Sequence, residues 1–298
     1  MPSGKRARQQ RQQAVAAPPP VRSKGGAGGL GARQASPRTL AIAGGVVVLV
    51  IVAIVLAVVL SKGNSSSTGG PGTNDGPNVG IASGTPQVGS STWANKVPFA
   101  TDVAKLFKGI PQSYFVLGQP NAPVTLVEYI DLQCPDCQQF ELTQLPTLVA
   151  KYVRPGKLKI KIQPWNILDR TPTQYDSLRG QKATIAAAAQ NKAFNFAELL
   201  YENQPYNSEG TGWMNDAMIS NVAASIDGLK PYQLATDASG SGTSGVISTV
   251  TDFANAHPTQ MTGTPTLYLG KGSSAPHWFF TGVPDLGNLE AAITALAK

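Results

Sequence analysis

The residues most able to do chemistry are Cys134 and Cys137, the only two cysteines among the 298 residues. Pro135 and Asp136 separate them, and an apolar run at residues 124–130 precedes them. A strand that leads into such a motif and opens a helix places a thiol at the helix N-terminus, where free backbone N–H groups and the helix dipole favour a negative sulfur. This arrangement predicts a reversible dithiol–disulfide pair.

Cys134 is the predicted nucleophile, because it lies where the helix begins and should carry the more exposed sulfur. Thiols at such positions have pKa values lowered to roughly 3.5–7.5 from about 8.5. Cys137, one helical turn inward, is the predicted resolving thiol. We expect Cys134 to form a mixed disulfide with a substrate sulfur, and a second substrate thiolate to release the oxidised substrate and the reduced pair.

Two other uses of the cysteine pair stay open. A static structural disulfide would close almost no loop and so would add little stability. Half of a metal site would need more ligands, and His257 and His277 lie far along the chain at no finger-like spacing. We expect no metal, and no cofactor beyond the redox-active disulfide Cys134–Cys137.

Glu128 is a candidate proton acceptor or relay for Cys137. By strand alternation it shares a face with Leu126 and Ile130, and an acid on an apolar face should have a raised pKa. The alternative is an acid near a solvated strand edge.

Three further residues could tune the redox pair. Asp131 is either a turn or capping residue or a proton relay. Asp136 either complements the helix dipole or raises the pKa of the Cys134 thiol by charge repulsion, which would make a milder oxidant. Pro135 occupies the first helical turn, where proline is favoured.

The elements that must position these residues can be outlined from the pattern. We expect strands at 113–117, 124–130 and 157–163 and a helix at about 134–153, so that the chain forms a parallel β-α-β unit. About a hundred residues then lack strand character, too many for one crossover helix, which predicts a helical insertion at about 166–257. Within and after it we expect helices at 175–192, 213–226 and 246–256, a hairpin of strands at 266–269 and 278–281, and a last helix with Asp285 as its N-cap.

This pattern resembles the DsbA-like thiol–disulfide oxidoreductases, from about residue 113 to the C-terminus. The resemblance rests on V-L-G at 116–118, N-A-P-V at 121–124, E-Y-I-D at 128–131 leading into the cysteines, and G-T-P-T at 263–266 before a late strand. It implies an α/β protein with a thioredoxin-like fold and an inserted helical subdomain.

The resemblance also implies roles for Thr264 and Pro265. The peptide bond between them would be cis and packed against the cysteines. The backbone of Thr264 would pair with an extended substrate segment, and its hydroxyl would lie near the Cys134 sulfur. A buried acid occupies the offset of Glu128 in the resembled family.

The N-terminal third has a different composition. Residues 1–39 carry eight basic and no acidic side chains and predict a disordered cytoplasmic tail, so the pI of about 9.4 does not indicate nucleic-acid binding. Residues 40–60 are apolar throughout and predict a transmembrane helix, with a buried core helix or a cleaved signal peptide as alternatives. Residues 61–95 predict a flexible Gly/Ser/Pro linker, and 96–298 the DsbA-like domain outside the cytoplasm.

Together these features predict a membrane-anchored oxidoreductase that forms disulfides in unfolded or reduced secreted and cell-envelope proteins. The resemblance implies reoxidation by a quinone-linked membrane protein of the DsbB or VKOR type. A reductase or isomerase with the same residues is the nearest alternative. A tethered thioredoxin-fold binding module without catalysis is another.

Overall fold

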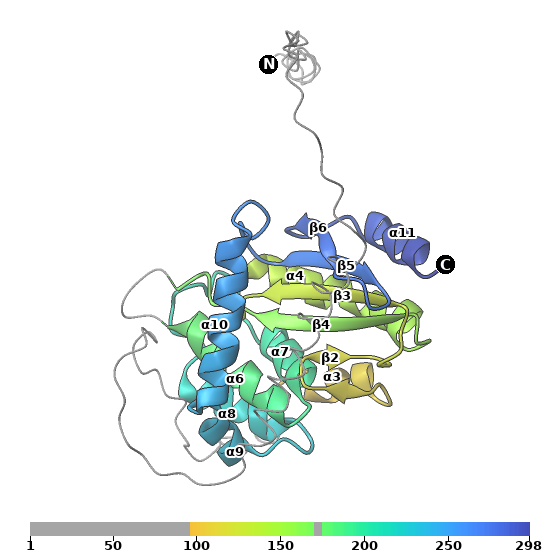
Figure 1. Ribbon diagram of the computed structural model, residues 1–298. Helices are drawn as coiled ribbons and strands as arrows, with labels where there is room; N and C mark the ends of the chain where they lie inside the picture. Colours follow the sequence, from red (N-terminus) through yellow and green to blue (C-terminus); the bar gives the residue numbers. More distant parts are fainter. Residues whose placement is uncertain (1–95, 170–174) are drawn as a thin grey trace, which may run out of the picture. The chain divides into compact units, whose positions relative to one another are not determined.

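The computed structural model describes residues 96–169 and 175–298 (Figure 1). The predicted tail, transmembrane helix and linker at 1–39, 40–60 and 61–95 lie outside these residues. Within the described part of the chain, no helix is long and apolar enough to cross a membrane.

A mixed six-stranded sheet forms the centre of the domain, in the order β1-β2-β4-β3-β5-β6. β3 is central, parallel to β4 and antiparallel to β5, and β5 and β6 form an antiparallel hairpin, so the predicted β-α-β unit and the late hairpin are confirmed. The strands are β1 (Gln112–Ser113), β2 (Val116–Leu117), β3 (Val124–Ile130), β4 (Leu158–Pro164), β5 (Thr266–Lys271) and β6 (His277–Thr281).

Between β4 and β5 the described chain is helical, from α6 to α10. In Figure 1, α8 and α9 lie below the sheet and α11 lies beside β5 and β6. The helices are α3 (Ala100–Phe107), α4 (Pro135–Thr143), α5 (Leu145–Leu148), the π-helical η1 (Val149–Val153), α6 (Asp176–Ala189), α7 (Ala193–Glu202), α8 (Asp216–Ser225), α9 (Pro231–Ala238), α10 (Ser241–Ala256) and α11 (Leu286–Leu296).

Two predicted elements are wrong in detail. The single strand expected at 113–117 is instead the hairpin of β1 and β2, because Tyr114 adopts a left-handed φ of 51° and reverses the chain. The single helix expected at 134–153 is divided into α4, α5 and η1. Pro146 has no N–H to continue the helical ladder, so it favours this break.

The two faces of β3 pack against different helices because side chains alternate along a strand. Leu126 and Ile130 are fully buried in the main core, together with Phe140 of α4. Tyr129 points to the other face, where it stacks on Phe253 of α10 with ring centroids 5.1 Å apart. The strand that leads into the cysteines is therefore held from both sides.

Gly180 in α6 allows close packing behind the cysteine loop. A Cβ at this position would lie 2.5 Å from the Met214 sulfur and 2.7 Å from Cβ of Leu132. We expect Gly180→Ala to lower the free energy of unfolding by about 1–3 kcal/mol, the usual cost of overpacking. Urea unfolding would measure the change.

The matched control is Gly245→Ala in α10, where a Cβ would meet nothing within 4 Å. Because alanine favours helix over glycine, this variant should be more stable by up to about 1 kcal/mol. An unchanged or higher stability of Gly180→Ala would contradict the packing argument.

Candidate active site

The two cysteines lie where the loop after β3 leads into α4. Cys134 is the N-cap residue of α4, with an extended backbone, and Pro135 is the first helical residue. The turn before the helix is closed by a bond from the Cys134 N–H to the Asp131 carbonyl, 2.9 Å long. Both thiols are free; Cys134 is 6% exposed and Cys137 is fully buried. The N-terminal sulfur is thus the more accessible one.

The Cys134 thiol has a pKa lowered from 9.0 to about 7. The largest cause is a hydrogen bond from the Cys137 thiol; burial opposes it, and the Thr264 side chain and the backbone N–H groups of Cys137 and Asp136 lower it further. Each of these donors stabilises the thiolate, as expected for a sulfur at a helix N-terminus.

The Cys137 thiol has a pKa raised well above its ordinary value, chiefly by burial and then by the neighbouring Cys134 sulfur. The pair is therefore asymmetric: the first proton is lost from Cys134, while Cys137 keeps its own. This asymmetry suits an attacking and leaving sulfur at Cys134 and a resolving thiol at Cys137.

The loop before β5 is brought against Cys134. The Thr264–Pro265 peptide bond is cis, as the resemblance implies. The Cys134 thiol donates to the Thr264 carbonyl at 3.2 Å. The Gly282 N–H donates to the Pro265 carbonyl at 2.7 Å and so fixes the loop to the end of β6.

Glu128 is fully buried on the central strand, not at a solvated edge. Its pKa is raised well above the ordinary value, first by burial and then by the neighbouring charges of Glu141 and Glu198. Glu128 also acts on Cys137, whose pKa its charge raises. The charge of this acid is therefore felt at the resolving thiol, and its part as a proton acceptor or relay stays a prediction.

Glu141 and Glu198 are site residues that sequence reasoning missed. Glu141 follows Cys137 by four residues in α4, a helical spacing that places both on one face and could have been noticed. Glu198 is brought in by α7 from the helical insertion, and no local pattern signals that contact.

Asp131 is a fully buried anchor for the turn. Its carboxylate accepts bonds from the Gln133 N–H at 2.9 Å, the Ser177 hydroxyl at 2.7 Å and the Leu168 N–H at 2.9 Å. Burial raises its pKa from 3.8 to about 6, although these bonds oppose the shift. The contacts are those of a turn residue, and its part in proton relay stays a prediction.

Gln133 is a third site residue that the sequence pattern did not reveal. Its side-chain amide donates to the Ser177 hydroxyl at 2.7 Å and to Asp169 at 3.2 Å, and accepts from the Gly210 N–H at 2.8 Å. Its carbonyl accepts from the Gln204 side chain at 2.7 Å. The residue before the nucleophile is thereby fixed to three segments of the helical insertion.

The remaining candidates lie at the surface or away from the sulfurs. The side chains of Pro135 and Asp136 are exposed, and Asp136 acts on Cys134 through its backbone N–H, so redox tuning by these residues stays a prediction. His257 bonds the Phe253 carbonyl of its own helix, and His277 is exposed on β6. Among residues 96–169 and 175–298, no three acidic, histidine or cysteine side chains are grouped to hold a metal.

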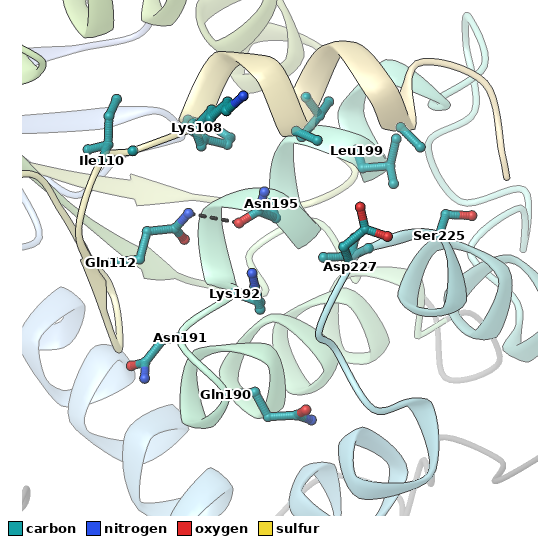
Figure 2. A pocket seen from close by; sticks show the side chains of 16 residues that line it. Lys108, Ile110, Gln112, Gln190, Asn191, Lys192, Asn195, Leu199, Ser225 and Asp227 are labelled. Atoms are coloured by element: carbon teal, nitrogen blue, oxygen red, sulfur yellow. Dashed lines mark hydrogen bonds between the residues drawn. The ribbon is translucent and has the colours of Figure 1, made fainter.

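A cavity of about 410 Å³ lies between α3, α7 and the loop after α8. Figure 2 shows Gln112 bonded to Asn195 across one wall, at 2.7 Å, with Lys192 and Asp227 nearby. None of the candidate redox residues lines this cavity. It is therefore separate from the cysteine site.

Three kinds of similarity can now be compared with this geometry. Residues 112–276 match the sequence profile of the thioredoxin family. A probable disulfide bond formation protein D of Bacillus cereus is 27% identical over 163 residues, which cover 54% of this chain and 71% of the relative. The disulfide bond formation protein D of Bacillus subtilis is 27% identical over 127 residues, and the chain spans about half of that relative (51%) and 40% of its own length.

Among solved structures, oxidised BdbD from Bacillus subtilis is similar, with a TM-score of 0.52 and 21% identity, over 63% of this chain and 97% of that one. At this identity the likeness concerns the fold. The cysteine motif, the cis-proline loop and strands β1 to β5 all fall within the family match, which covers more than half of the 298 residues. The chain belongs to the thioredoxin family.

Proposed function

We propose that this protein introduces disulfides into secreted or cell-envelope proteins through the Cys134–Cys137 pair. The enzyme class, thiol–disulfide oxidoreductase, is supported by the relatives named disulfide bond formation protein D. The observation that carries the proposal is the asymmetry of the two sulfurs, with the Cys134 pKa lowered to about 7 and the Cys137 pKa raised.

The asymmetry assigns each sulfur its step in the reaction. A substrate thiolate attacks the Cys134 sulfur of the oxidised pair, the Cys134–Cys137 bond breaks, and its electron pair stays on the Cys137 sulfur, which takes up a proton. A second substrate thiolate attacks the mixed disulfide, and Cys134 leaves as a thiolate. A leaving thiol of low pKa departs readily, and a stabilised thiolate favours the reduced enzyme and hence substrate oxidation.

Substrate backbone would be held by the loop before β5. In the reduced form the Thr264 carbonyl accepts from the Cys134 thiol. Once that sulfur is bonded to another sulfur it has no proton to donate, so the carbonyl becomes available to a backbone N–H of an extended substrate. Such strand-like pairing reads little sequence, which suits a general oxidase.

The Cys134 titration can be tested directly. We expect the alkylation rate of the reduced protein to rise with pH around a midpoint near 7. Thr264→Val should raise the midpoint, because it removes the side-chain hydroxyl that lowers the Cys134 pKa. Thr259→Val, at an exposed threonine outside the site, is the matched control. An identical midpoint in the Thr264 variant and the wild type would reject this role.

The direction of exchange can be tested by the reduction potential of the pair. Thioredoxin, a reductant, has a potential of about −270 mV, and DsbA, a strong oxidant, about −120 mV. A value near that of thioredoxin would favour the reductase or isomerase alternative. A Cys134 thiol that stays inert to alkylation after reduction would favour the non-catalytic binding module.

The proposal places the catalytic domain outside the cytoplasm, anchored through residues 40–60 with the N-terminus inside. The apolar run and the basic residues before it support this orientation. Reoxidation would come from a quinone-linked membrane protein of the DsbB or VKOR type. Protease digestion of intact cells would degrade the domain if it is outside, and full protection would reject the orientation.

A further inference from the structure

Three acidic side chains from three different elements meet in the core beside Cys137. Glu128 on β3, Glu141 on α4 and Glu198 on α7 are 0%, 2% and 3% exposed. None of the ion pairs formed by the described residues involves these acids. Their charge is therefore not neutralised by a cation in this part of the chain.

Three carboxyl oxygens of this group have no donor unless the acids themselves carry protons. Both oxygens of Glu128 and Oε2 of Glu198 are buried without a partner. An ionised carboxylate only accepts, whereas a protonated one also donates. Glu141 lies between the other two and is in side-chain hydrogen-bonding contact with both. Protons shared among the three acids would therefore supply the hydrogen bonds that these oxygens otherwise lack.

Electrostatics agrees with this geometry. Burial is the first cause of a raised pKa at all three acids, and repulsion from Glu141 adds to it at Glu128 and Glu198. The Glu141 pKa is raised to about 8. Around neutral pH the cluster therefore holds protons that it can give and take back.

A series of electrostatic interactions links the resolving thiol to the surface. At its inner end, the charge of Glu128 acts on Cys137. At its outer end, Glu198 lies one helical turn before Glu202, whose charge raises the Glu198 pKa. Glu202 is the last residue of α7 and is partly exposed. Its charged neighbour is Asp102 of α3.

We propose that Glu141 and Glu198 form a proton path that connects Glu128 to water at Glu202. The inference rests on the proposed function and extends it, because it assigns the helical insertion a part in proton exchange. Tyr201 packs beside the acids, but its hydroxyl donates to the Asp131 carbonyl, so it is not a member of the path.

The proton balance follows the exchange reaction. When the Cys134–Cys137 bond breaks, the Cys137 sulfur takes the bond's electron pair and a proton from Glu128, which becomes a carboxylate. Glu141 reprotonates Glu128, Glu198 reprotonates Glu141, and water reprotonates Glu198 through Glu202. Reoxidation of the pair runs the same transfers in reverse.

The test measures exchange of the buried carboxyl protons in the reduced full-length protein. After transfer into D₂O, infrared spectroscopy follows the shift of the carboxyl C=O bands as they become deuterated. We expect Glu198→Gln to slow this exchange for the remaining acids by roughly 10²-fold, the low end of what a positioned acid–base group contributes. Glu198→Asp keeps a carboxyl group and should restore much of the rate.

Glu290→Gln, in α11 and outside the cluster, is the matched control and should leave exchange unchanged. Glu202→Gln, at a partly exposed site, serves as a second variant if Glu198→Gln does not fold, and should also slow exchange. Wild-type exchange rates in both variants would overturn the path.

Separate experiments can reject the proton path and the proposed function. Oxidation of a dithiol peptide by the wild-type protein tests the function and does not depend on the Glu198 variant. Normal peptide oxidation with unaltered carboxyl exchange in the variants would reject only the path.

Discussion

Replacing Cys134 by serine is expected to reduce substrate oxidation to the uncatalysed background. A hydroxyl neither forms a disulfide nor leaves as a stabilised thiolate, so both exchange steps are lost. The assay follows the loss of free thiols in a reduced, unfolded test protein mixed with stoichiometric oxidised enzyme. The fold should persist, because serine is smaller than cysteine and the site is slightly exposed.

Replacing Cys137 by serine should let a mixed disulfide accumulate when the reduced variant meets a test protein that already contains a disulfide. The Cys134 thiolate attacks that disulfide, one substrate sulfur bonds to Cys134, and the other leaves as a thiolate. Cys134 keeps its place at the start of α4, but the enzyme has no Cys137 thiol to resolve the adduct. Non-reducing electrophoresis would show a covalent complex that a reductant dissolves. Persistent oxidation by Cys134→Ser, or the absence of an adduct with Cys137→Ser, would contradict the assigned roles.

Raising the pH from about 5 to 7 is expected to destabilise the protein markedly. The Glu141 pKa is raised from 4.5 to about 8 on folding, so between these values the native state binds one more proton than the unfolded chain. The free energy of unfolding then falls as the pH rises, by up to about 1.4 kcal/mol per pH unit for one such group. This loss of stability starts near pH 4.5 and is complete once the pH passes about 8.

Asp131 also lowers the free energy of unfolding as the pH rises from 3.8 to about 6, because its pKa is raised over this range on folding. Urea unfolding of the reduced protein from pH 5 to 7 would measure the combined slope. Above pH 7 the lowered Cys134 pKa adds stability as the pH rises, so the measurement stops there. Glu141→Gln should flatten the slope, because the amide has no proton to lose, whereas Glu290→Gln on α11 should leave it unchanged. Stability that stays constant or rises over this range would show that the acids do not hold their protons as described.

The sequence predicted those features that depend on local chemistry. The strand at 124–130 agrees with β3 residue for residue, since an apolar run bounded by turn residues has few alternatives. Asp285 caps α11 by accepting from the Asn288 N–H at 2.9 Å, as expected from its place before an apolar helix face. The start of α4 at the cysteine motif follows from the same kind of signal.

What the sequence could not show depends on tertiary contacts. The short helix α3 and the helix α9 were not predicted. The meeting of Glu141 with Glu198 requires α4 and α7 to pack together, which periodicity within either helix does not reveal. Gln133 looks like an ordinary loop residue until the helical insertion is folded around it.

The side chain of Gln133 has a consequence for how the active site responds to a change of pH. An amide gains and loses no proton over the range in which Asp131, Glu141 and Cys134 change charge. Its bonds to the Ser177 hydroxyl and the Gly210 N–H therefore survive acidification, whereas its bond to Asp169 ends on a carboxylate that can take up a proton. In a more acidic compartment, protonation of Cys134 would slow thiol–disulfide exchange. The loop position that Gln133 holds through the Ser177 hydroxyl and the Gly210 N–H would remain the same for an approaching substrate.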